Sequence, residues 1–161
     1  MFKQLTLTAS LVVAALFSGH ALAETATNTF QVKMTILKSC SVAAGASSDI
    51  ALGPVTSTAI NTAGSNTISV TCSKDTGYSI GLTPSNGDLS GAGAMSSGSL
   101  VPVPYQLHSG SATGPAWGST SGAVAGTGNG TAQSHQIFAV APSANYTPGS
   151  YADTVTVTVT Y

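Results

Sequence analysis

Positive charge is scarce in this sequence, which contains no arginine and only four lysines. Nucleic acids and anionic lipids are bound chiefly through contacts from Lys and Arg to phosphate, so this composition argues against either partner. Acidic residues are scarce as well, and none forms a close pair in the sequence of the kind that glycoside hydrolysis uses. The five acids are Glu24, Asp49, Asp75, Asp88 and Asp153.

Motifs for catalysis and for metal binding are also lacking. His108 and His135 each adjoin a predicted strand, where a surface or turn position is the commoner setting for histidine. No serine lies in a Gly-x-Ser-x-Gly turn, and no CxxC or HxxxH spacing suggests a zinc site. The glycine-rich stretch 126–130 lacks the lysine of a phosphate-binding loop. We therefore expect no enzyme activity, no metal and no cofactor.

Long apolar runs are absent except near the N-terminus. Lys3 precedes the apolar segment 5–17, and Ala21-Leu22-Ala23 has the small residues of a cleavage site. The alternative is a membrane anchor, but the apolar run is shorter than the roughly 20 residues that a spanning helix needs. We predict a secretory signal peptide over residues 1–23 and export of the remaining chain.

Cysteine is limited to Cys40 and Cys72. In an exported protein two cysteines most simply form one disulfide. The alternative is a metal site shared with His108 or His135, which lacks the ligand spacing of a structural zinc site. A disulfide here closes a loop of about 30 residues, for which the chain-entropy model gives a stabilisation of roughly 3–4 kcal/mol.

Alternation of polar and apolar residues is abundant and predicts an all-β sandwich without helices. The two most polar, glycine-rich stretches, 85–99 and 110–134, are predicted loops. Strands 66–72 and 78–82 are expected to form a hairpin. The predicted strands are 30–36, 40–42, 49–54, 66–72, 78–82, 103–107, 136–140 and 154–161.

The clearest alternation lies in residues 154–161. It places Val155, Val157, Val159 and Tyr161 on one face of a strand and threonines on the other. The strand carries no charge, although natural sheets usually protect their edges with charged residues.

A second alternating strand lies in residues 24–39, where Phe30, Val32, Met34 and Ile36 share one face. Two interpretations are open for it. The strand either pairs within its own sheet or adds to the strand edge of another copy.

Aromatic residues offer one further interpretation. Trp117, Tyr105 and Tyr146 could line a sugar-binding face, but packing in or over the sandwich core is the favoured alternative. Asp153, at the start of the last strand, is expected to cap the preceding turn.

Several motifs together resemble those of the spore coat protein U domain family, which includes subunits of archaic, Csu-type chaperone–usher pili. One departure is Leu52-Gly53, where the family usually has Phe-Gly. The matching features are an alternating strand before the first cysteine (30–40), the second cysteine at the end of a strand (69–73), Tyr78-x-Ile80-x-Leu82, Tyr105-x-Leu107, Trp117-Gly118, a Thr-Gly-rich segment near Gly126, and the ending 148–161.

The resemblance implies an incomplete immunoglobulin-like β-sandwich that lacks its last strand and is completed by donor-strand complementation. A periplasmic chaperone first supplies a strand. At an outer-membrane usher, the N-terminal strand of the next subunit replaces it. Carried onto this chain, residues 24–39 are the donor segment and 40–161 the pilin domain. Phe30, Val32, Met34 and Ile36 are the donor side chains. Val155, Val157, Val159 and Tyr161 form the acceptor and chaperone-binding edge.

The function that the resemblance implies is that of a structural subunit of a cell-surface pilus, which supports adhesion and biofilm formation. Its partners are then other pilin subunits, a chaperone and an usher. The alternative is a self-contained secreted coat or carbohydrate-binding module, whose N-terminal strand stays in its own sheet.

Overall fold

Eight strands and no helix make up the part of the chain that this computed structural model describes, residues 24–44 and 49–161. The chain divides into two units, 1–35 and 36–161, and the predicted signal peptide lies outside the described residues. No helix in the described ranges is long and apolar enough to cross a membrane. The strands are β1 (Cys40–Ala44), β2 (Ile60–Cys72), β3 (Gly77–Pro84), β4 (Ala92–Met95), β5 (Val103–Ser109), β6 (Val124–Thr127), β7 (Ala132–Ser143) and β8 (Val155–Thr160).

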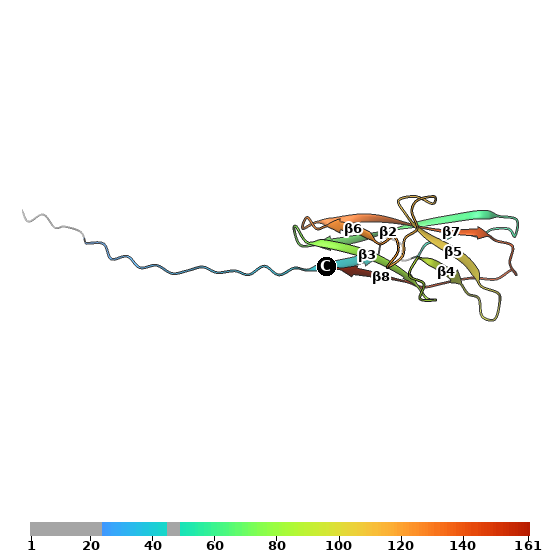
Figure 1. Ribbon diagram of the computed structural model, residues 1–161, viewed down its shortest axis with the longest axis horizontal. Coiled ribbons are helices and arrows are strands. Elements are labelled where there is room, and N and C mark those ends of the chain that lie inside the picture. Colours follow the sequence, from blue (N-terminus) through green and yellow to red (C-terminus); the bar gives the residue numbers. More distant parts are fainter. Residues whose placement is uncertain (1–23, 45–48) are drawn as a thin grey trace, which may run out of the picture. The chain divides into compact units, whose positions relative to one another are not determined.

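The strands of unit 36–161 form two antiparallel sheets. The larger has the order β1-β2-β7-β5-β4, and the smaller has the order β6-β3-β8. Long pairing between β2 and β7, from Ile60↔Ser143 to Thr71↔Ala132, forms the centre of the larger sheet. The predicted all-β sandwich is confirmed, and Figure 1 shows β3 and β8 lying side by side in the smaller sheet.

The core lies between the two sheets and contains Trp117, which is 1% exposed. Its Nε1–H donates a hydrogen bond of 2.9 Å to the carbonyl of Ile80 on β3, and its backbone N–H donates to the carbonyl of Leu107 on β5. Trp117 thereby joins both sheets while its indole N–H is satisfied, as a buried indole requires. Tyr105 is buried too, so packing in the core is the correct interpretation for both residues.

Two glycines make room for the rings of buried tyrosines. A Cβ atom at Gly93 on β4 would collide with the ring of Tyr105, and one at Gly126 on β6 would collide with the ring of Tyr78. Each tyrosine therefore packs over the backbone of a neighbouring strand that has no side chain at that point. These contacts explain why both short strands are glycine-bearing and hard to see in a hydrophobicity pattern.

The predicted hairpin between 66–72 and 78–82 is wrong. These residues lie in β2 and β3, which belong to different sheets. The connection crosses between the sheets through Asp75, whose φ is 59° and whose backbone N–H donates to the carbonyl of Gly128. Alternation identifies a strand and its buried face, but it contains no information about which neighbour the strand pairs with.

The two predicted loops are partly wrong, since β4 lies within 85–99 and β6 within 110–134. The short strand predicted at 49–54 is absent. Ile50 and Leu52 nevertheless pack against the core, so the apolar residues of this segment indicated burial rather than strand pairing.

No strand forms at residues 30–36, although alternation predicts one there. A strand requires neighbouring backbone groups for its hydrogen bonds. The only hydrogen bond described in residues 24–36 is a local one, from the backbone N–H of Thr29 to the side chain of Asn28. Residues 30–36 alternate in sequence, but they pair with no strand among the residues that the structure describes.

Cys40 and Cys72 form a disulfide, as expected from the cysteine content. The two residues are directly paired in register between β1 and β2, so the bond ties the edge strand β1 to the larger sheet.

Replacing both cysteines with serine is expected to lower the free energy of unfolding by roughly 3–4 kcal/mol. Urea denaturation of the oxidised protein and of the double variant measures this difference. An unchanged midpoint would show that pairing between β1 and β2 holds the edge strand without the bond.

Candidate functional site

Strand β8 has one free edge. In the order β6-β3-β8 it pairs with β3 alone among the described strands. Its valines are partly buried against the core, and its threonines are exposed. The unpaired N–H and C=O groups along such an edge are a template for an added strand, and β8 has no charged residue to discourage one.

A groove of about 550 Å³ runs between the two sheets beside β8. Its lining combines the inner face of the larger sheet, which we call its floor, with residues of β8 and residues 49–52. We call it the inter-sheet groove. It is lined by Ala44, Asp49, Ile50, Ala51, Leu52, Asn66, Ile68, Met95, Tyr105, Leu107, Ile137, Ala139, Tyr151, Ala152, Asp153, Val155 and Val157.

The floor of the groove is largely apolar and includes core residues. Ile68, Ile137 and Leu107 are at most 5% exposed, yet each lines the groove. On β7 the inward residues become smaller from Ile137 to Ala139, which leaves space above the sheet. An apolar side chain placed there would complete the contacts that these residues lack on one side.

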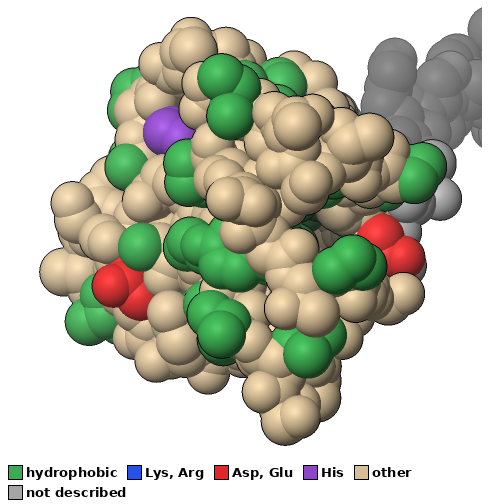
Figure 2. All heavy atoms as spheres, turned by 90° about the vertical axis from the view of Figure 1, so that its right-hand side faces the viewer, with side chains coloured by type: hydrophobic (Ala, Val, Ile, Leu, Met, Phe, Trp, Pro, Cys, Tyr) green, Lys and Arg blue, Asp and Glu red, His purple; other side chains and the backbone are tan. Residues whose placement is uncertain are grey.

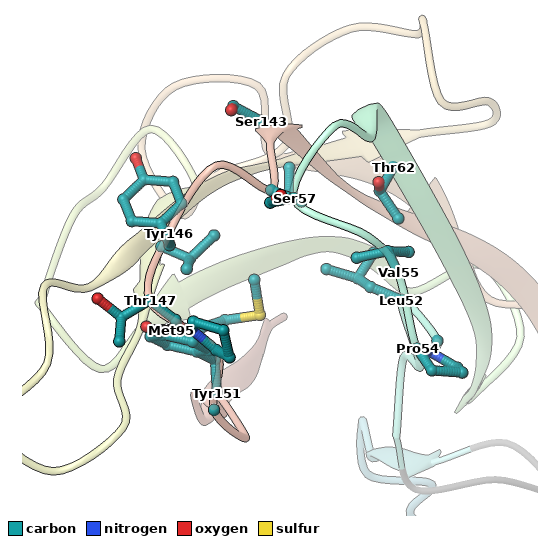
Figure 3. Close-up of a pocket in the computed structure, with 16 residues that line it drawn as sticks. Leu52, Pro54, Val55, Ser57, Thr62, Met95, Ser143, Tyr146, Thr147 and Tyr151 are labelled. Atoms are coloured by element: carbon teal, nitrogen blue, oxygen red, sulfur yellow. Dashed lines mark hydrogen bonds between the residues drawn. The ribbon is translucent and has the colours of Figure 1, made fainter.

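The groove adjoins a second cavity of about 380 Å³, and Leu52, Met95 and Tyr151 line both. Figure 3 shows Met95 projecting into this cavity across from Leu52 and Val55. Figure 2 views the sandwich from the right-hand end of Figure 1, where hydrophobic side chains gather around a hollow and no lysine is visible.

Several polar side chains interrupt the apolar lining of the groove, among them Asp49, Asn66 and Asp153. Tyr105 on β5 donates a hydrogen bond of 2.7 Å to the Oδ2 atom of Asp153, just before β8. The backbone N–H of Thr154 donates to the other carboxylate oxygen at 2.8 Å. The interaction joins the two sheets. The hydrogen bonds described for Asp153 go to Ser85, Tyr105 and Thr154, so none of them supports the expected capping of the preceding turn.

Burial alone would raise the pKa of Asp153, but its hydrogen bonds outweigh that effect. The side chain of Ser85, then the Tyr105 hydroxyl and the backbone, stabilise the charged form, and the pKa falls below its ordinary value. Burial, and next the bond to the carboxylate, raise the pKa of Tyr105. Asp153 is therefore ionised and Tyr105 neutral throughout the physiological range.

The four alternating apolar residues of the N-terminal segment are highly exposed. Phe30 is 89%, Val32 88%, Met34 82% and Ile36 77% exposed. Because an exposed row of four large apolar side chains is rare in soluble proteins, this segment is a candidate for binding elsewhere.

His108 and His135, the histidines considered as possible catalytic or metal-binding residues, have separate surroundings. His108 hydrogen bonds through Nδ1 to the carbonyl of Gly114 at 2.7 Å. The Nε2 atom of His135 lies 3.0 Å from the hydroxyl of Tyr78, and burial lowers the pKa of His135. The described residues contain no group of three or more His, Cys, Asp or Glu side chains that could hold a metal.

The predicted acceptor-edge residues differ in their surroundings. Val155 and Val157 line the groove, Val159 packs against the core, and Tyr161 is 56% exposed.

Sequence reasoning did not identify the floor of the groove. Ile68, Leu107 and Ile137 were recognisable only as inward residues of their strands. Their position in one groove depends on which strands share a sheet.

Comparison with known proteins places this geometry in a family. The profile of the Spore Coat Protein U domain matches residues 26–158. No curated protein matches the sequence.

Among the solved structures that match, one resembles the fold with a TM-score of 0.50 at 23% sequence identity. It is the crystal structure of the CsuC-CsuE chaperone-tip adhesion subunit pre-assembly complex from archaic chaperone-usher Csu pili of Acinetobacter baumannii. The match covers 79% of this chain and 40% of the other, so the protein spans about two fifths of the matched chain. This likeness supports the fold alone. The family match covers most of the sequence, and the protein belongs to the Spore Coat Protein U domain family.

Proposed function

We propose that this protein is a structural subunit of a chaperone–usher pilus and polymerises by donor-strand exchange. The observation that carries the proposal is the inter-sheet groove, which has a largely apolar floor and β8, with its free edge, among its lining strands. The occupant is residues 30–36 of a second copy, whose four apolar side chains are exposed. The same chain then contains both an apolar groove and an apolar strand that can fill the groove of another copy.

The dimensions agree with this assignment. The apolar donor residues span seven residues from Phe30 to Ile36, which is about 20 Å between the first and last Cα atoms in extended form. The inward residues of β7 from Ile137 to Ser143 span the same number, and the two cavities together extend along them. Burying four such side chains gives a gross gain of roughly 6–12 kcal/mol, and backbone hydrogen bonds along β8 add to it.

The proposal also covers the route to the cell surface. The signal peptide of residues 1–23 directs the chain to the periplasm, and residues 24–39 and 40–161 serve as donor segment and pilin domain. A periplasmic chaperone covers the groove first, because a free strand edge beside an apolar groove invites aggregation. At an outer-membrane usher, the donor strand of the next subunit then replaces the chaperone in the groove. The family membership and the fold of the matched complex support this order of assembly steps.

The test is an electrophoresis of the purified protein in SDS, with and without boiling. Because the donor strand completes the fold of its acceptor, the joint opens only when the acceptor unfolds. We expect a ladder of multimers without boiling and a single monomer band after it. A monomer in both lanes would contradict the proposal and favour a self-contained secreted module.

A further inference from the structure

The carboxylate of Asp153 lies in the groove, and no cationic side chain of the described residues pairs with it. Its hydrogen-bond donors are the hydroxyl of Tyr105, the backbone N–H of Thr154 and Ser85. These groups hold the carboxylate in position but leave its negative charge uncompensated. In the open groove, water solvates that charge.

An entering strand removes that water, so the side chain that it places on Asp153 matters. An apolar side chain there would desolvate a charge without replacing its solvent, which is unfavourable. A cation would instead form an ion pair reinforced by the low dielectric of the filled groove.

Residues 24–39 contain two lysines, Lys33 and Lys38. Lys33 alternates with the apolar donor residues and therefore points away from the groove when they point into it. Lys38 lies two residues after Ile36 and so shares the inward face. Lys38 is thus the one cation of this segment that can reach into the groove.

We propose that Lys38 of the incoming copy pairs with Asp153 and thereby sets the direction and register of strand exchange. This inference rests on the proposed function. Asp153 lies two residues before Val155, as Lys38 lies two residues after Ile36. Antiparallel pairing with Lys38 opposite Asp153 places Ile36, Met34, Val32 and Phe30 opposite Val155, Val157, Val159 and Tyr161, respectively.

Other arrangements are less favourable for reasons visible in the same residues. An antiparallel shift by two residues places Ile36 against the carboxylate, and a shift by one residue turns all the apolar side chains outward. Parallel pairing of Lys38 with Asp153 carries the donor residues toward 145–151, away from β8. The charge therefore selects one arrangement among several that apolar burial alone would allow.

Cross-linking on the outer face of the strands tests the register without altering the groove. In the proposed register Thr35 faces Thr156, whereas shifts by two and four residues bring Lys33 and Gln31 there. Three full-length variants combine Thr156→Cys with Thr35→Cys, Lys33→Cys or Gln31→Cys. After boiling without reductant, we expect a persistent ladder for the Thr35→Cys pair alone, and single-cysteine variants as controls should show none.

A persistent ladder for the Lys33→Cys or Gln31→Cys pair instead would overturn the register. Unboiled lanes separate this outcome from failure of the proposed function, since all three variants should form ladders before boiling. If none of the three variants forms a ladder before boiling, the proposed strand exchange is wrong.

A double-mutant cycle tests the ion pair. Lys38→Gln should speed the decay of the unboiled ladder at a fixed temperature by roughly tenfold, and Lys33→Gln should leave it unchanged. In an Asp153→Asn background Lys38→Gln should have little further effect. An equal effect in both backgrounds would show that Lys38 acts without Asp153 and would overturn the pairing.

Discussion

Replacing Val32 with aspartate is expected to convert the SDS-resistant ladder into monomer. Val32 is one of the exposed apolar residues of the donor segment, and in the proposed assembly it is buried in the groove of another copy. Losing its burial forfeits about 1.5–3 kcal/mol, and an unpaired carboxylate between the sheets adds a larger desolvation cost. We expect these terms to weaken the joint by at least about a thousandfold.

Thr35→Asp is the matched control for this change. It adds the same charge to the same segment, but on the face that would point to solvent. Electrophoresis without boiling should show a ladder for Thr35→Asp and monomer for Val32→Asp. If Val32→Asp assembles as well as Thr35→Asp does, residues 30–36 are not the donor strand.

The second large effect is expected at the acceptor side, from Val157→Asp. Val157 lines the inter-sheet groove from β8 and packs against the core. An aspartate there would confront an entering apolar strand with a charge, so we expect the ladder to be lost although the donor segment is unchanged. Unboiled electrophoresis measures this.

Thr158→Asp on the exposed face of the same strand is the control, and its ladder should persist. Near-ultraviolet circular dichroism of both variants checks that the core around Trp117 is intact. A folded Val157→Asp variant that still polymerises would exclude β8 as the acceptor edge.

Local sequence patterns predicted those strands that have strong alternation. Residues 66–72, 103–107 and 136–140 all lie in strands of the larger sheet, and 155–160 form β8. Each of these strands has one buried face, so its hydrophobic period is visible without knowledge of its neighbours. The pairing of strands was not visible, because the crossing at Asp75 between the two sheets depends on a backbone contact with the distant Gly128.

Of the candidate site, only the inward residues of β8 and the apolar row of the donor segment were predictable from the sequence. Alternation identified Val155 and Val157 as inward residues and Phe30 to Ile36 as an apolar row. The floor of the groove combines residues from three non-adjacent stretches of sequence, such as Ile68, Leu107 and Ile137. Asp153 illustrates a further limit, because its bond to Tyr105 spans two sheets and no local turn pattern indicates it.

The central claim is that the groove of one copy receives residues 30–36 of another. The most direct test mixes the Val32→Asp variant, which keeps a groove, with the Val157→Asp variant, which keeps a donor segment. We predict that each variant alone runs as a monomer, and that the two refolded together give one SDS-resistant dimer band and no longer ladder. Monomer alone from the mixture of two folded variants would contradict the account.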